Sequence, residues 1–260
     1  MAFYNLNPYI QALIGTLFTF LVTTMGAAVV YFFKKVNKKV LDIMLAFAGG
    51  IMISASFFSL INPAIEMTYK LNINTWITIS IGFLLGGLFL FISDKSFNKI
   101  LSNKNNSLKR IILLILSITI HNIPEGLVVG VSFASAYFNI DGASITSAII
   151  LTIGIALQNF PEGCAISLPL RREGLSLNKS FLYGTLSGIV EPISGVIGAL
   201  LVLKIRLLLP FLLSFAAGAM IYVVISEIIP ESQTNNNKEL MSISSLIGFT
   251  IMMILDIALG

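Results

Sequence analysis

The sequence has few charged residues, one cysteine and one histidine, and these shortages exclude several classes of protein. Charged residues make up 11% of the 260 residues and hydrophobic residues 56%, with a mean hydropathy of +0.93. Soluble domains have about 25% charged and about 45–50% apolar residues, so a soluble domain is excluded. The single Cys164 excludes an intrachain disulfide framework. The composition therefore indicates a polytopic membrane protein.

Long apolar runs occupy most of the chain, and short polar segments separate them. Each run is near or above the roughly 20 residues that a helix needs to cross a bilayer. The eight runs cover residues 8–33, 40–65, 75–93, 111–135, 144–170, 179–203, 207–230 and 240–259. The first run is too long for a cleaved signal peptide and has no basic segment before it. We therefore expect an all-α bundle of eight transmembrane helices that forms a single domain over residues 1–260.

The basic residues are unevenly distributed among the connections between these runs. Thirteen of the 16 Lys and Arg residues lie in alternate connections: Lys34, Lys35, Lys38, Lys39, Lys95, Lys99, Lys104, Lys109, Arg110, Arg171, Arg172, Lys179 and Lys238. Because cytoplasmic loops are enriched in Lys and Arg, both termini are predicted to be extracytoplasmic, in a multi-pass protein of the cell membrane. The net charge of +4 thus reflects orientation in the bilayer, and no nucleic-acid partner is expected.

A short polar motif occurs twice inside the apolar runs. His-Asn-Ile-Pro-Glu-Gly covers residues 121–126, and Gln-Asn-Phe-Pro-Glu-Gly covers residues 158–163, 37 positions later. The two runs are expected to cross the membrane in opposite directions, so the repeat predicts inverted-repeat symmetry with a site near the bilayer midplane. Asn, Pro and Gly can also kink two packed helices without any further role. The charged residues favour a functional site, because an ionisable group at membrane depth is costly.

The spacing within the motif is that of ligands on one helix face. His121 and Glu125 are four residues apart, as are Gln158 and Glu162, so each pair shares one face of its helix. Four groups of the kinds that bind metals can therefore converge between the two helices.

Three further polar residues extend this set. Asn122 and Asn159 lie about 100° further around their helices and can reach a second, adjacent position. Glu191, which precedes Pro192 in the sixth run, adds a third carboxylate. Three ionised carboxylates without a buried Lys or Arg are costly unless a cation compensates them, which favours a divalent metal. Mixed nitrogen and oxygen donors suit Zn²⁺, Fe²⁺, Mn²⁺ or Cd²⁺ better than Cu⁺.

These motifs resemble those of a known transporter family. The paired motifs, the eight-helix layout with external termini, and Gly-Ile-Val-Glu-Pro at residues 188–192 are similar to the ZIP (Zrt-, Irt-like protein) family of zinc and iron transporters. Gln158 stands where many members have His. This difference and the segment 50–60, which contains Met52, resemble a bacterial GufA-like branch.

The resemblance implies a binuclear-type metal site and movement of metal into the cytoplasm. It assigns one position to His121, Glu125, Gln158, Glu162 and the sulfur of Met52, and an adjoining position to Asn122, Asn159 and Glu191 with the same two shared motif glutamates. Zinc is the expected cargo, with cadmium, iron and manganese as further candidates, and no cofactor is expected. From its sequence context alone, Met52 can equally be a core residue.

Carboxylates at three helix ends suggest where the metal enters and leaves. Glu66 ends the second run and Asp256 the eighth, both on the predicted external side, where they can form an acidic mouth. Glu227 ends the seventh run on the cytoplasmic side and can receive the ion on its way out. The alternative for each is a solvated carboxylate without a role in transport.

Two other functions stay open on the sequence. An intramembrane metalloenzyme usually needs two or more nitrogen ligands, yet the chain has one His and no His-Glu-x-x-His motif. A structural membrane scaffold would leave the buried glutamates unexplained. Glycine patterns such as Gly82-x-x-x-Gly86 allow close helix contacts either within the bundle or across a homodimer interface.

Overall fold

The described part of the chain is helical, without a strand. The computed structural model describes residues 3, 6–32, 37–100, 106–140, 143–172, 174–202, 206–233 and 237–259. The elements are α1 (Pro8–Ala28), η2 (Val29–Tyr31), α2 (Lys38–Ala55), η3 (Ser56–Ile61), α3 (Asn62–Lys70), α4 (Thr75–Ile100), α5 (Asn106–Tyr137), α6 (Ile145–Arg172), α7 (Leu177–Gly188), α8 (Val190–Leu201), η4 (Arg206–Leu208), α9 (Leu209–Val223), η5 (Val224–Ile228), α10 (Ile229–Ser232) and α11 (Lys238–Leu259).

Seven segments of the described residues are long and apolar enough to cross a membrane. They are Pro8–Tyr31, Lys38–Lys70, Thr75–Phe97, Ile145–Arg171, Leu177–Leu201, Leu209–Ser232 and Lys238–Ala258. These coincide with seven of the eight predicted runs, which confirms the all-α class. The remaining run, 111–135, lies within the 32 residues of α5, and several of its side chains fall outside the described part of the chain. The count of eight spans therefore stays a prediction.

Polar side chains fix where the spans begin and turn. Asn7 accepts a hydrogen bond from the amide of Tyr9 at the start of α1, and Asn37 accepts one from the amide of Lys39 at the start of α2. Such N-caps satisfy amide groups that have no partner within the helix. After α3 and α5 the chain turns through Asn72 and Asn139, each with φ of 51°, a conformation that Asn tolerates better than most residues.

Prolines widen two of the spans without ending them. The π-helical segments η3 and η5 end at Ile61 and Ile228, each two residues before a proline, Pro63 and Pro230. Proline has no N–H for the carbonyl four residues earlier, and a π-helical turn accommodates the missing bond within a continuous helix. By contrast, α5 and α6 stay α-helical through Pro124 and Pro161.

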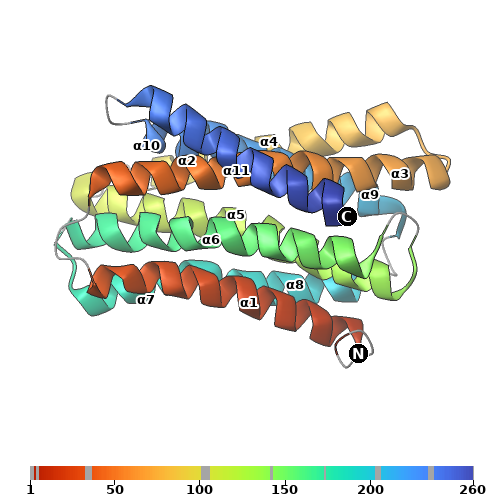
Figure 1. The fold of residues 1–260 in the computed structure, drawn as a ribbon, viewed down its shortest axis with the longest axis horizontal. Helices are drawn as coiled ribbons and strands as arrows, with labels where there is room; N and C mark the ends of the chain where they lie inside the picture. Colours follow the sequence, from red (N-terminus) through yellow and green to blue (C-terminus); the bar gives the residue numbers. More distant parts are fainter. Residues whose placement is uncertain are drawn as a thin grey trace.

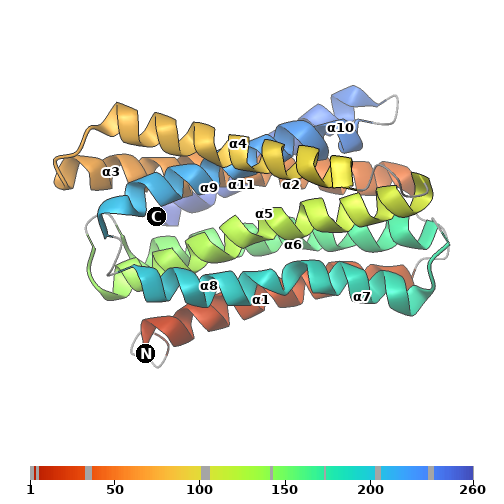
Figure 2. The same cartoon turned by 180° about the vertical axis from the view of Figure 1, so that it is seen from behind.

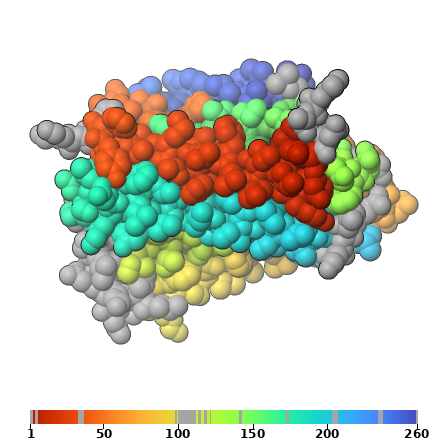
Figure 3. Space-filling model, turned by 90° about the horizontal axis from the view of Figure 1, so that it is seen from below, coloured from red at the N-terminus to blue at the C-terminus, as the bar shows by residue number. Residues whose placement is uncertain are grey.

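The two motif helices occupy the middle of the bundle. In Figures 1 and 2, α5 and α6 lie side by side, with α1, α7 and α8 on one side and α2, α4, α9 and α11 on the other. The most extensive packing joins α1 to α6, α5 to α8, α4 to α9 and α2 to α11. Figure 3 shows α1 and the α7–α8 segment as adjacent bands over one face of the molecule. The polar residues of α5 and α6 are therefore enclosed by other helices.

The glycine patterns serve packing within the bundle. A Cβ on Gly86 of α4 would collide with the carbonyl of Phe215 in α9, and one on Gly50 of α2 with the carbonyl of Ser245 in α11. These helices approach so closely that only glycine fits at the contact. The contacts account for the glycines without a second chain, and the homodimer stays a prediction.

Candidate metal site

The two motifs and the start of α8 bring their polar side chains into one buried region. The residues of this region that are 0% exposed are Asn122 and Glu125 of α5, Gln158, Asn159 and Glu162 of α6, and Glu191 of α8. The carboxylates of Glu162 and Glu191 both lie close enough to repel that of Glu125. The structure thus brings the described polar side chains of the two motifs together.

Gln158 and Glu125 form a hydrogen-bonded pair across the two motif helices. The amide Nε2 of Gln158 donates to Oε1 of Glu125. Oε1 of Gln158 and Oε2 of Glu125 are buried and receive no hydrogen bond from the described residues. The pair therefore presents one amide oxygen and one carboxylate oxygen that can accept a further ligand.

Asn159 makes the equivalent contact with Glu191. Its Nδ2 donates to both carboxylate oxygens of Glu191 at 2.9 Å, and to the carbonyl of Thr19 at 3.3 Å. These bonds fix the amide plane, and Oδ1 of Asn159 is left buried without a hydrogen bond from the described part of the chain. The carboxylate of Glu191 is held from two sides, because the hydroxyl of Thr19 also donates to its Oε2.

The break between α7 and α8 positions the third amide. The helix is interrupted at Ile189, before Pro192, because proline lacks an N–H and its ring crowds the preceding turn. Beside this break, the carbonyl of Ser187 accepts a hydrogen bond of 3.2 Å from Nδ2 of Asn122. Oδ1 of Asn122, like that of Asn159, has no hydrogen-bond partner among the described residues.

Two threonines of α1 also belong to this region, although no motif in the sequence predicts a role for α1. Thr19 and Thr23 are 0% exposed, and both lie against the carboxylate of Glu191. Thr16, Thr19 and Thr23 follow the spacing of one helix face, so they form a polar stripe along an otherwise apolar span. This stripe is the sequence signal that could have identified α1 as a neighbour of the site.

The motif glycines set how closely the flanking helices approach. The space that a Cβ on Gly126 would need is taken by the carbonyl of Glu191, and the space at Gly163 by the carbonyl of Thr23. α8 thus packs directly against α5, and α1 against α6. This close packing brings Glu191 and Thr19 within reach of the motif side chains.

The structure shows no ligand contact for two predicted ligands, His121 and Met52, among the described residues. The backbone of His121 lies in α5, and its side chain is outside the described part of the chain. Met52 is 0% exposed within the hydrophobic core, so its role as a ligand stays a prediction. The described residues contain no group of three or more His, Cys, Asp or Glu arranged as metal ligands. The open acceptors of the site are largely amide oxygens of Asn and Gln, which are not among these four residue types.

The predicted mouth and exit residues lie away from this region. Glu66 on α3 is exposed, while Asp256 on α11 accepts a hydrogen bond of 2.7 Å from Ser59 in η3. Glu227 lies in η5, and Tyr222 near the end of α9 has both Glu227 and Asp94 of α4 beside it. Asp94 and Tyr222 were not predicted, since neither belongs to a motif.

Comparison with known proteins identifies the family. The family model described as "ZIP Zinc transporter" matches residues 8–111 and 102–256. The chain is 37% identical to "Zinc transporter ZIP11" of Bos taurus, over 98% of each chain. It is 33% identical to "Zinc transporter ZIPB" of Bordetella bronchiseptica, over 96% of this chain and 81% of the relative, and 32% identical to "Zinc transporter GufA" of Myxococcus xanthus, over 95% and 98%. The protein therefore belongs to the ZIP family of zinc transporters.

Proposed function

We propose that this protein carries divalent metal, zinc first, across the cell membrane into the cytoplasm. Membership in a family of metal transporters, with spans that make it a multi-pass membrane protein, supports this function. Cadmium, iron and manganese are further candidate cargoes, because the donors are of borderline softness. The metal is cargo, and the proposed transport needs no cofactor.

One observation carries the proposal. Asn122, Gln158 and Asn159 each donate their amide N–H groups to protein oxygens. Their three amide oxygens and Oε2 of Glu125 are buried and accept no hydrogen bond from the described residues. A buried acceptor without a partner costs about 1–3 kcal/mol, so four together are unexpected unless something else binds them. A divalent cation is the partner that oxygen donors beside three carboxylates favour.

The proposed site has two adjoining positions. Glu125, Gln158, Glu162 and His121 hold one metal, and Met52 lies on the same side in the arrangement that the family resemblance implies. Asn122, Asn159 and Glu191 hold the other and share the two motif glutamates. The two hydrogen-bonded pairs, Glu125 with Gln158 and Glu191 with Asn159, support this division into two positions.

The membrane potential and the carboxylates supply the energetics of uptake. A potential of about 100 mV, negative inside, favours entrance of a doubly charged ion by about 4.6 kcal/mol. Mutual repulsion of the three glutamates in the empty site favours binding of a cation. The chain therefore needs no ATP to move metal inward, and release follows when one group of helices moves against another.

The proposed topology has eight spans with both termini outside and an inverted repeat that relates α5 to α6. α5 and α6 are neighbours and each carries one copy of the motif. The matched packing of Gly126 against α8 and of Gly163 against α1 supports the repeat, since each motif helix meets its partner helix at the same motif position. A metal bound between α5 and α6 then lies near the bilayer midplane.

The other functions have less support. The ZIP family is a transport family, so the protein is not assigned as an enzyme, in agreement with its lack of a His-Glu-x-x-His motif. A scaffold role gives no reason for the buried, open oxygens described above. Metal transport accounts for both the family membership and the buried, open oxygens.

Uptake into proteoliposomes tests the proposal. Purified protein is reconstituted into vesicles that contain a metal-sensitive dye, and Zn²⁺, Cd²⁺, Fe²⁺ and Mn²⁺ are supplied outside in competition. Saturable zinc uptake that an inside-negative potential accelerates is expected. Fluxes no larger than those of empty vesicles for all four metals would overturn it.

A further inference from the structure

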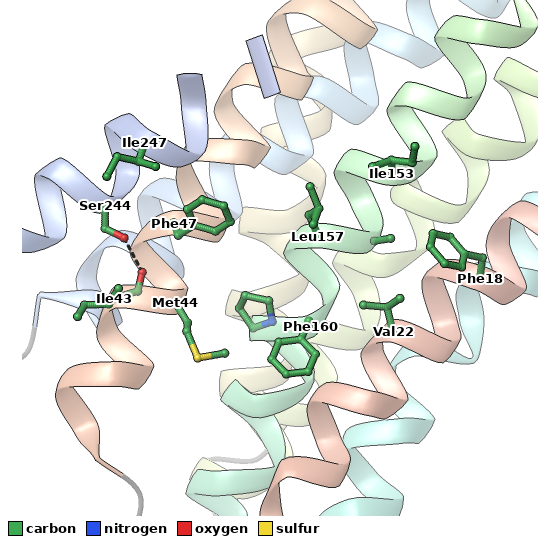
Figure 4. Close-up of a pocket in the computed structure, with 12 residues that line it drawn as sticks. Phe18, Val22, Ile43, Met44, Phe47, Ile153, Leu157, Phe160, Ser244 and Ile247 are labelled. Atoms are coloured by element: carbon green, nitrogen blue, oxygen red, sulfur yellow. Dashed lines mark hydrogen bonds between the residues drawn. The ribbon is translucent and has the colours of Figure 1, made fainter. Parts of the chain in front are cut away.

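A groove of about 640 Å³ opens on the surface where α1, α2, α6 and α11 meet (Figure 4). Phe18 of α1, Leu157 of α6 and Ile247 of α11 line it and are 47%, 39% and 50% exposed. All four helices are candidate membrane spans. The groove therefore faces the bilayer.

The lining of the groove is suited to hydrocarbon. Ser244 is the one polar residue among those that line it, and its hydroxyl donates to the carbonyl of Ile43 at 2.8 Å, the dashed line in Figure 4. Among the described residues, the side chains that line the groove thus offer no free hydrogen-bond donor to water. An empty groove of this size would leave its walls without dispersion contacts, so a chain from the surrounding bilayer is expected to fill it.

Exposed cations gather at one end of the groove. Lys39 lies one helical turn before Ile43 on the same face of α2, about 6 Å along the axis. Lys238 begins the neighbouring α11, and Arg171 is the second-last residue of α6. The start of α11 and the end of α6 lie at the same end of the bundle (Figure 1). The acidic residues at this end of these elements are the exposed Glu239 of α11, the exposed Glu231 of α10, which packs against α2, and the buried Asp42 of α2. This end is the predicted cytoplasmic one, where the leaflet carries anionic lipids and basic residues between helices attract their headgroups.

From these features we propose that the groove binds a phospholipid with an anionic headgroup. One acyl chain fills the apolar groove, and the phosphate lies near Lys39 and Lys238. The apolar lining binds the acyl chain, and the lysines at the positive end favour an anionic headgroup and fix its orientation.

The groove lies directly behind the candidate metal site. Leu157, Phe160 and Pro161 of α6 line the groove, whereas Gln158 and Asn159 of the same turn are buried on the other side. A bound lipid therefore contacts α6, α1 and α2 together and braces the helix that carries half of the site. This consequence for uptake rests on the proposed function, but lipid binding itself does not.

Tryptophan quenching by brominated lipids tests the binding site without any metal. The chain has one tryptophan, Trp76, which is removed by Trp76→Phe. In that background, Phe18→Trp places a probe at the groove, and Leu88→Trp on α4 places a control at the bilayer surface. The two positions have matching exposures of 47% and 46%. The full-length proteins are reconstituted in bilayers that contain a small fraction of brominated phosphatidylglycerol or brominated phosphatidylcholine.

The proposal predicts that the Phe18→Trp probe is quenched at an about fivefold lower fraction of phosphatidylglycerol than of phosphatidylcholine. The Leu88→Trp control is expected to respond to both lipids alike. Adding Lys39→Gln and Lys238→Gln, both at exposed positions, is expected to remove the preference. Equal quenching of the Phe18→Trp probe by the two lipids would overturn the anionic headgroup, and a response identical to that of the control would overturn the site itself.

Discussion

Thr19 of α1 donates a hydrogen bond to the carboxylate of Glu191 in α8, 172 residues away in the sequence. The same carboxylate accepts from Asn159 of α6, so two spans hold the acidic group of a third in place. A carboxylate fixed in this way keeps its orientation when metal binds, which lowers the cost of assembling the site.

Thr19→Val should weaken metal binding without unfolding the protein. A hydrogen bond to a charged group contributes about 1.5–3 kcal/mol, so half-saturation of zinc uptake is expected to rise roughly tenfold or more. Thr19→Ser keeps the hydroxyl and should restore the wild-type value. Thr24→Val is the matched control, since Thr24 of the same helix bonds only the carbonyl of Phe20 among the described residues. If Thr19→Val and Thr24→Val behave alike, Thr19 does not position Glu191.

Glu125→Ala, Glu162→Ala and His121→Ala should each abolish zinc uptake and leave the protein folded in detergent. Removing one carboxylate relieves repulsion in the empty site, so the thermal unfolding temperature of the two glutamate variants is expected to stay level or rise. Glu231→Ala, at an exposed position, serves as the control. Near-normal uptake by Glu162→Ala would contradict the sharing of this residue between two metals.

Gly163→Ala should separate α1 from α6. Its new methyl group would collide with the carbonyl of Thr23, and overpacking of this kind costs about 1–3 kcal/mol. The unfolding temperature is expected to fall. Gly87→Ala is the matched control, because the nearest atoms to its added carbon lie at 3.5 and 3.7 Å, an ordinary contact. An equal effect of the two substitutions would mean that the α1–α6 contact is not tight.

Neutralising Glu66 and Asp256 together should slow uptake most at low ionic strength and low metal concentration. A surface field that concentrates cations is screened beyond about 8 Å at physiological salt, so the maximal rate should change little. Ser59 holds Asp256 by a hydrogen bond of 2.7 Å. Ser59→Ala removes this bond and keeps the charge of Asp256, so it separates the effect of position from the effect of charge. A loss that is equal at every salt and metal concentration would identify these carboxylates as structural.

Gln158→His should shift selectivity toward zinc. Gln158 offers a neutral amide oxygen, whereas His would offer an imidazole nitrogen, which zinc prefers. Competition between Zn²⁺ and Mn²⁺ is expected to favour zinc more strongly, with a lower half-saturation and, where release limits turnover, a lower maximal rate. An unchanged preference together with an unchanged half-saturation would remove Gln158 from the metal ligands.

The spans and the motif residues could be predicted because each depends on one segment of the chain. Hydropathy over about 20 residues identifies a span, and spacing by four residues places Glu125 and Glu162 on defined helix faces. α4 nevertheless continues to Ile100, beyond the predicted end at residue 93, because the polar residues there include no Gly or Pro.

The role of Thr19 could not be read from the sequence, because it depends on which distant helices meet. Threonine in a helix ordinarily bonds the carbonyl three or four residues earlier, and Thr19 does so to Thr16 just as Thr24 does to Phe20. The hydrogen bond of Thr19, and not of Thr24, to Glu191 depends on how α1 packs against α6 and α8. The orientation of the three amides is likewise a property of the assembled bundle.

The most direct test of the account is an anomalous difference map from crystals of the protein grown with zinc. Peaks are expected between α5 and α6, with a carboxylate oxygen of Glu125 or Glu162 at about 2.0–2.2 Å, the usual zinc–oxygen distance. The amide oxygens of Gln158, Asn122 and Asn159 should face the bound metal. A map in which zinc binds elsewhere, while these oxygens remain without a ligand, would contradict the central claim.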